Sequence, residues 1–218
     1  MSEALRSSTG VDTDILESLR ERIRVLEGGA RVQRGRRPSG VAAIDELVGG
    51  LPVPGIVELS GPRGSGVTSL ALSLAAASVA GGGLVAWVDA EASLYPPAVA
   101  RCGVSLARLL VVRPVADGQH AELWAAEQLL RSGCFGLVVI DRLEGGVLRS
   151  TGHGWARACE HGHCVALVLS ERPARWLPAE VRLSVGASRV TVGRDRGGRA
   201  GRRASLPEVP EGVAAWPP

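Results

Sequence analysis

From residue 55 onward the sequence alternates between short apolar runs, rich in Val and Leu, and segments with helical spacing. The apolar runs cover 56–59, 84–89, 109–112, 137–140, 165–169, 181–185 and 189–192, and the helical segments cover 67–79, about 97–102, 119–132 and about 153–160. Runs without polar alternation are typical of strands buried on both faces, and intervening helices are typical of parallel sheets. We therefore predict an α/β fold with a mostly parallel central sheet and helices on both faces.

A glycine-rich segment lies between the first of these runs and the first helix. It comprises Gly61, Pro62, Arg63, Gly64, Ser65, Gly66, Val67, Thr68 and Ser69. In a phosphate-binding loop, glycines let backbone N–H groups surround a phosphate, the helix N-terminus adds a positive dipole, and a Thr or Ser hydroxyl holds Mg²⁺. The pattern is matched at Gly61, Gly66 and Thr68, but Val67 stands where the pattern requires lysine. A later apolar run ends in Asp141, where such proteins place a carboxylate that holds Mg²⁺ through water.

The missing lysine is part of a wider bias, because the chain contains no lysine at all. All 25 basic residues are arginine, against 22 acidic residues, which gives a net charge of +3. Base composition explains most of this bias. It does not explain position 67, because codon preference would have supplied arginine there, and Val67 is neither lysine nor arginine. Loss of transition-state charge stabilisation typically lowers a rate on the order of 10²–10³-fold. We therefore predict that the chain is not an enzyme.

The basic residues concentrate at the two flanks of the chain and leave its body mildly acidic. We predict a disordered segment over 1–12, an amphipathic helix and basic linker over 13–37, a core over 38–192, and a disordered Gly/Arg/Pro-rich tail over 193–218. The basic tail would contact DNA or an acidic partner through charge, with little reading of sequence. The arginines expected to do so are Arg189, Arg194, Arg196, Arg199, Arg202 and Arg203.

The predicted N-terminal helix has one apolar face, which must be buried either against its own domain or against a partner. That face consists of Ile15, Leu16, Leu19, Ile23 and Leu26.

Other segments bear on membrane insertion, targeting and metal binding. The apolar stretch 70–80 is too short to span a bilayer, and the first residues lack the order of a signal peptide, so we expect a cytoplasmic protein. Cysteine and histidine crowd residues 159–164 without the separated pairs of a zinc site, so we expect no metal.

Over about residues 38–192 the chain resembles the RecA family of recombinase ATPases. The resemblance rests on the segments 38–52, 61–69, 83–91 and 130–141 in continuous register. It implies a RecA-like P-loop sandwich in which Glu91 matches the catalytic glutamate, Thr68 the Mg²⁺-holding hydroxyl and Asp141 the strand-end carboxylate. Four positions depart from the family: Val67 replaces the phosphate-gripping lysine, Tyr95 and Ala98 replace the two adenine contacts, and Glu171 replaces the sensor glutamine. Glu91 would then be vestigial.

The basic opening and the Gly/Arg-rich end are similar to the ImuA group, whose members are encoded beside ImuB and an error-prone polymerase. The resemblance implies a non-catalytic adaptor or regulator in SOS-induced translesion DNA synthesis, with ImuB and RecA as partners. No cofactor is expected, although weak binding of ATP and Mg²⁺ stays open. Two alternatives stay open as well: a RecA-like ATPase in which Arg63 replaces lysine, and a RecA-filament regulator or SulA-like cell-division inhibitor. The sequence leaves the oligomeric state undecided.

The segment after the fifth apolar run, 172–180, is too short for a long mobile DNA-binding loop. Trp176 within it either packs on the sheet edge or stacks on a base, and the commoner fate of an aromatic side chain favours packing.

Overall fold

The computed structural model describes residues 35–114, 121–141, 149–186 and 188–206. The chain divides into two units, Met1–Gln33 and Arg34–Pro218, and all described residues belong to the second unit. The predicted disordered start and the predicted helix over 13–27, with its apolar face, therefore lie outside the described residues.

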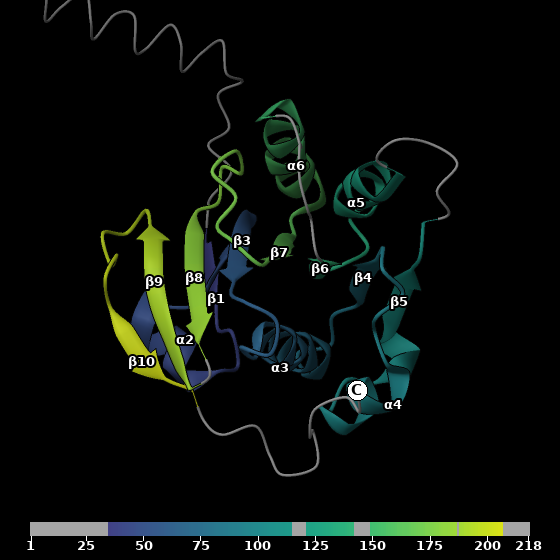
Figure 1. Cartoon of the computed structure of the whole chain (residues 1–218). Coiled ribbons are helices and arrows are strands. Elements are labelled where there is room, and N and C mark those ends of the chain that lie inside the picture. The colour runs from purple at the N-terminus through teal and green to yellow at the C-terminus, as the bar shows by residue number, and fades with distance from the viewer. Residues whose placement is uncertain (1–34, 115–120, 142–148, 187, 207–218) are drawn as a thin grey trace, which may run out of the picture. The chain divides into compact units, whose positions relative to one another are not determined.

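The alternation of apolar runs and helices is confirmed within the second unit (Figure 1). The helices are α2 (Ala42–Val48), α3 (Val67–Ala80), α4 (Pro96–Arg101), the 3₁₀ turn η1 (Leu106–Arg108), α5 (Ala121–Arg131) and α6 (Arg149–Gly162). The strands are β1 (Gly35–Arg37), β2 (Leu51–Val53), β3 (Gly55–Ser60), β4 (Val85–Asp89), β5 (Leu109–Val112), β6 (Leu137–Asp141), β7 (Val165–Ser170), β8 (Val181–Gly186), β9 (Arg189–Asp195) and β10 (Arg203–Ser205). The sequence did not signal α2, β1, β2 or β10.

An eight-stranded sheet forms the centre of this unit, in the order β10-β9-β8-β3-β7-β6-β4-β5. The strands from β8 to β5 are parallel, while β9 and β10 add antiparallel pairs beyond β8. Every residue of β3, β4, β6 and β7 is buried, because these strands have helices on both faces. The fold prediction of a mostly parallel α/β sheet is confirmed.

Two apolar cores lie on the two faces of the sheet. One core joins α2, α3 and α4 to the sheet and includes Leu74 and Trp87, and the other joins α5 and α6 and includes Leu130 and Trp155. Figure 1 shows α3 and α4 on one side of the strands and α5 and α6 on the other. Adjacent residues of one strand serve different cores, as Trp87 and Val88 of β4 do, because side chains alternate across a strand.

The predicted disordered tail is wrong for its first part, because residues 193–206 complete the sheet. Strand β9 continues to Asp195 and β10 pairs with it from Arg203 to Ser205. Ala204 and Leu206 pack against the core that contains α2 and α3. The glycine and arginine content of this segment suggested disorder, but Asp195 binds Arg36, and Arg199 and Arg202 donate to carbonyls at the end of α2. Residues 207–218 lie outside the described residues.

The predicted linker is wrong at its end for a related reason, because Gly35–Arg37 forms β1 and pairs with β2. Arg36 of this strand contacts both the end of α2 and Asp195 at the end of β9. Its Nη1 donates to the carbonyls of Val48 (2.5 Å) and Gly50 (3.0 Å), and its Nη2 lies 2.6 Å from Asp195 Oδ1. Arg199 Nη1 also donates to Val48 O (3.0 Å) and approaches Asp195 Oδ2 (3.3 Å). Two arginines therefore neutralise the carbonyl end of α2.

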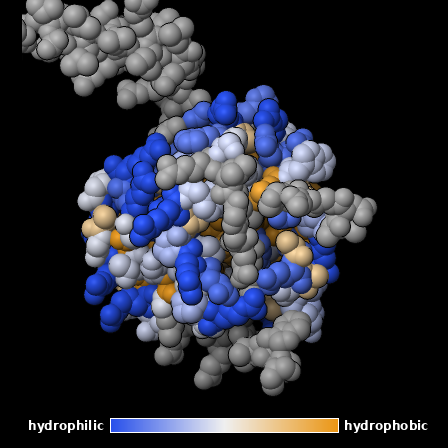
Figure 2. Space-filling model, turned by 45° about the horizontal axis from the view of Figure 1, so that its top comes forward, coloured by the Kyte–Doolittle hydropathy of each residue, from blue (hydrophilic) through white to orange (hydrophobic). Residues whose placement is uncertain are grey.

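Hydrophilic side chains cover most of the face of the molecule that Figure 2 shows, with apolar residues in small areas between them. None of the helices among the described residues is both long and apolar enough to cross a membrane.

We expect Asp195→Asn to lower the free energy of unfolding at pH 7 by about 1–3 kcal/mol, because a buried charged hydrogen-bond partner of Arg36 is lost. Burial raises the pKa of Asp195, but hydrogen bonds from Arg36 and the Gly197 N–H, with the charges of Arg36 and Arg199, outweigh it and hold the pKa below its usual value. A lowered folded-state pKa gives stability that is complete above the unfolded pKa of about 4 and disappears as the pH falls through the folded pKa.

The difference between wild type and Asp195→Asn should therefore shrink between pH 4 and pH 2, as measured by urea unfolding. Glu127→Gln is the control, because Glu127 pairs with Arg131 on the surface of α5 and should contribute less than about 0.5 kcal/mol. An Asp195→Asn deficit of constant size from pH 7 to pH 2 would contradict the assignment.

Candidate phosphate-binding site

The carboxyl ends of the parallel strands bring the predicted site residues to one edge of the sheet. The glycine-rich loop follows β3, Glu91 follows β4, Asp141 ends β6, and Glu171 follows β7. The register places Ser60 opposite Ser170 and Asp89 opposite Asp141, so these ends are level with one another. The crevice outside the carboxyl ends of the strands is where open α/β sheets bind their ligands.

The loop has the backbone geometry of a phosphate-binding loop. Gly64 and Gly66 have φ values of 80° and 93°, which only glycine adopts without strain, and Gly66 is the residue that precedes α3. A Cβ at Gly61 would lie 2.5 Å from Ser65 Oγ and would also collide with the carbonyl of Val185. The N-cap residue Gly66 has no side chain that could cap the first turn of α3, and the N–H groups of such a helix N-terminus can bind an anion.

Val67 occupies the lysine position of this loop and is turned toward the protein interior. It packs half-buried against the core that contains α3, and its Cγ2 lies 3.2 Å from the place of a Cβ on Gly61. Thr68, the next residue, is exposed, while Ser65 Oγ is buried and has no hydrogen-bond partner within the described residues. The loop therefore keeps its glycines and its hydroxyl but offers an apolar side chain where a cation is required.

Arg63, the only basic residue in the loop, contacts the two carboxylates that face it. Its Nε lies 2.9 Å from Glu171 Oε1, and its Nη2 lies 3.7 Å from Glu91 Oε2. The three side chains are 62%, 42% and 39% exposed, so each pair contributes at most about 1 kcal/mol. The structure thus joins Arg63, Glu91 and Glu171 in one surface cluster, in which two acids face the loop that would hold a phosphate.

Asp89 has a role that the sequence did not reveal. Its buried carboxylate accepts hydrogen bonds from the backbone of Ser93 (2.8 Å) and Leu94 (3.2 Å) and from Arg113 Nε (3.0 Å). These bonds fix the turn that contains Glu91. The sequence shows only that Asp89 is an acidic residue at the end of an apolar run. An acidic residue in that place is equally typical of an exposed loop, so the buried role could not be predicted.

The segment 172–180 is anchored at several points. Buried Glu58 accepts hydrogen bonds from Ser170 Oγ (3.1 Å) and from the Ala174 N–H (2.5 Å). Arg182 Nη2 donates to the carbonyls of Ala174 (2.7 Å) and Leu177 (2.6 Å). Glu58 Oε2 and Arg182 Nε lie 2.8 Å apart but off the N–H direction, so this contact is an ion pair without a hydrogen bond.

Trp176 in this segment packs edge-on against buried Trp155, with ring centroids 6.1 Å apart. Trp176 therefore packs against the core that contains α5 and α6, as the sequence favours, while stacking on a base stays untested. A segment held by Glu58, Arg182 and Trp155 is short and fixed.

The six arginines expected to contact DNA or an acidic partner divide into two groups. Arg199 and Arg202 donate to carbonyls at the end of α2, Arg202 Nη1 to Leu47 O at 3.4 Å. The other four, Arg189, Arg194, Arg196 and Arg203, are exposed on β9, β10 and the turn between them. Contact with DNA stays a prediction for these four.

Cys159 and Cys164, near the end of α6, are buried free thiols that interact with each other. A hydrogen bond between the buried thiols raises the pKa of Cys159 and lowers that of Cys164, and burial adds to the rise at Cys159. Among the described residues no group of three or more His, Cys, Asp or Glu side chains is placed to hold a metal ion.

Comparison with known proteins places this geometry in context. A family model described as the RecA N-terminal domain matches residues 20–163. The RecA proteins of Frankia alni and of a Picosynechococcus strain are 40% identical over 106 residues and 39% identical over 117 residues. These matches cover 48% and 53% of this chain but only 30% and 33% of the relatives, so the chain spans about a third of their length. The crystal structure of the RadB recombinase superposes with a TM-score of 0.61 at 19% identity, covering 76% of this chain and 93% of RadB.

We expect Arg182→Met to lower the free energy of unfolding by about 3–5 kcal/mol, because it leaves the buried charge of Glu58 uncompensated. The double variant Glu58→Gln/Arg182→Met should recover part of that loss, since glutamine is neutral and still accepts the bonds from Ser170 and Ala174. Urea unfolding of both variants measures the difference. Equal stability of the single and the double variant would contradict a buried ion pair at this position.

Proposed function

We propose, from the premise that this chain belongs to the family of the RecA N-terminal domain, that it is a RecA-like protein that has lost catalysis and acts through its partners. The observation that supports this most strongly is Val67, which packs into the core at the position of the phosphate-gripping lysine. The resemblance to the ImuA group supplies the finer part of the proposal: an adaptor in SOS-induced translesion DNA synthesis that binds ImuB, RecA or both.

The electrostatics of the loop support the loss of catalysis. Arg63 is the only cation of the loop, and its guanidinium already contacts Glu171 and Glu91. A triphosphate would have to displace these carboxylates or accept their repulsion at short distance. The anchored segment 172–180 supports the same proposal, because a recombinase loop that follows DNA during strand exchange has to move.

A second candidate function is a RecA-like ATPase in which Arg63 replaces lysine. The observation in its favour is that the glycines, Thr68, Glu91 and Asp141 all stand at the same edge of the sheet. A third candidate, a filament regulator or SulA-like division inhibitor, shares the fold without catalysis. Nucleotide binding separates the first two candidates, and partner capture from DNA-damaged cells separates the first from the third.

We expect calorimetry to detect at most weak binding of Mg-ATP to the wild-type protein. Val67→Lys should tighten binding about tenfold or more, because it restores a charge-assisted contact to the phosphates. Adding Glu171→Gln should tighten it further by removing a facing acid. Leu106→Lys is the matched control, since it adds the same charge at an exposed site away from the loop.

If wild-type protein hydrolyses ATP in a single turnover at rates typical of recombinases, and Glu91→Gln abolishes that hydrolysis, then the chain is an enzyme.

For the partner surface, we expect the double variant Leu19→Asp/Ile23→Asp to lose capture of ImuB or RecA while its thermal stability stays within about 0.5 kcal/mol of wild type. The reason is that a partner-facing apolar stripe loses binding when it is charged, whereas an internal stripe loses stability. Pull-down and thermal unfolding are measured on the same preparations. Arg22→Asp, a charge change in the same sequence segment but off the apolar stripe, is the control. Lost stability with intact capture would assign the stripe to the interior.

A further inference from the structure

A pocket of about 340 Å³ lies at the opposite end of α3 from the phosphate loop. The lining of this pocket, called the Arg37 pocket, includes Arg37, Gly40, Leu51, Leu74, Ser78 and Gly83. Ser78 follows Val67 by eleven positions, which is about 16 Å along a helix, so the pocket is separate from the loop. Its volume is at the lower end of the range of small-molecule sites, which is about 300–1,000 Å³.

The positive charge of Arg37 lies in this pocket without a carboxylate partner among the described residues. The side chain is half-buried, and its Nη2 donates to the carbonyl of Gly136 at 3.2 Å. Within the described residues no carboxylate pairs with it, whereas its neighbour Arg36 pairs with Asp195 and the partly buried Arg182 pairs with Glu58. Burial lowers the pKa of the Arg37 guanidinium, and the nearby Cys164 thiol offsets this only in part.

Ser78 supplies a second donor that is not used elsewhere in the described structure. Its Oγ is buried and has no hydrogen-bond partner there. Three carbonyls at the end of α3 already accept hydrogen bonds from backbone N–H groups. The donors are Gly81, Gly82 and Gly83, and the acceptors are Ala77 O, Val79 O and Ser78 O, respectively. A buried hydroxyl without a partner costs about 1–3 kcal/mol, which a ligand oxygen would recover.

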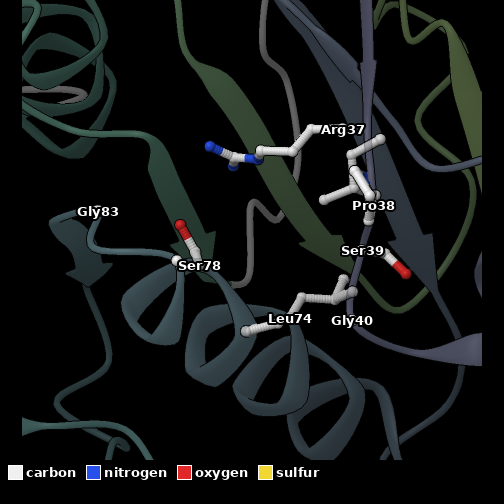
Figure 3. A pocket seen from close by; sticks show the side chains of 10 residues that line it. Arg37, Pro38, Ser39, Gly40, Leu74, Ser78 and Gly83 are labelled. Carbon is white, nitrogen blue, oxygen red and sulfur yellow. The ribbon is translucent and has the colours of Figure 1, made fainter.

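The two donors belong to the same end of the pocket. A Cβ built on Gly136 would lie 3.0 Å from Arg37 Nη1 and 3.6 Å from Ser78 Oγ. Figure 3 shows the Arg37 guanidinium extending over the end of α3, with the Ser78 hydroxyl directed to that side. Leu51, Leu74 and Ala77 also line the pocket and give it apolar surface.

We propose that the Arg37 pocket binds the carboxylate of a small organic acid whose apolar part packs against Leu51 and Leu74. One guanidinium and one hydroxyl match the single charge and two oxygens of a carboxylate, and the planar guanidinium fork can bind a carboxylate in a bidentate manner. This site is independent of the phosphate loop and of the proposed adaptor function.

The test uses the full chain and two probes of equal shape, isobutyrate and its neutral analogue isobutyramide. Isobutyrate should shift the amide NMR signals of Gly40, Gly81 and Gly83 in a saturable manner, and isobutyramide should bind at least about tenfold more weakly. Arg37→Met should weaken isobutyrate binding about tenfold to a hundredfold. Arg131→Met, which removes an exposed arginine from α5, should leave it unchanged.

Ser78→Ala separates a binding role from a structural one, because it removes a hydroxyl that has no partner in the free protein. This variant should bind isobutyrate several-fold more weakly while its melting temperature stays equal to wild type or rises. Three outcomes would overturn the proposal: equal binding of the two probes, no saturable shift with either, or isobutyrate binding unchanged in Arg37→Met. Shifts confined to Gly64 and Gly66 would place the anion at the phosphate loop and would also overturn it.

Discussion

The burial of the parallel strands on both faces determines where polar groups can stand in this protein. Strands β3, β4, β6 and β7 are buried along their whole length. A charged side chain inside them is costly unless it has an ion-pair or hydrogen-bond partner. Glu58 is such a case and is held by Arg182, Ser170 and Ala174. All other polar chemistry is displaced to the strand ends, and for this reason Arg63, Glu91, Asp141 and Glu171 meet at one edge.

The loop after β3 separates two requirements that phosphate-binding proteins usually satisfy together. Gly61, Gly64 and Gly66 satisfy a steric requirement, since a side chain at Gly61 would collide with Val185 and the other two have positive φ. The lysine satisfies an electrostatic requirement, and Val67 does not. The requirement at Gly61 comes from the protein's own packing, since a Cβ there would meet Val185 O and Ser65 Oγ whether or not a phosphate binds. The backbone shape of this loop is therefore compatible with a purely structural role.

Sequence patterns predicted the central part of this fold well, because strands buried on both faces leave an unambiguous apolar signal. Strand β5 over 109–112 matches the prediction in both bounds, and α5 and α6 differ at their ends only. The glycine spacing likewise located the loop. The missed strands β1 and β10 are only three residues long, which is too short to leave a periodic pattern in the sequence. Arg36 of β1 is also bound to Asp195, 159 positions away, and such a contact leaves no local pattern. The same holds for the Arg63 cluster and the Arg37 pocket, whose members are distant in sequence.

The link between Arg36 and Asp195 also sets an order of events during biosynthesis. A chain leaves the ribosome from its N-terminus, and Arg36 precedes Asp195 by 159 positions. The carbonyl of Val48 accepts from Arg36, which is made early, but its second bond comes from Arg199, 151 positions later, and forms only once β9 and the turn after it have emerged. The earliest helix of the core is thus completed by some of its last residues, which makes closure of this domain a late step that follows synthesis of the sheet.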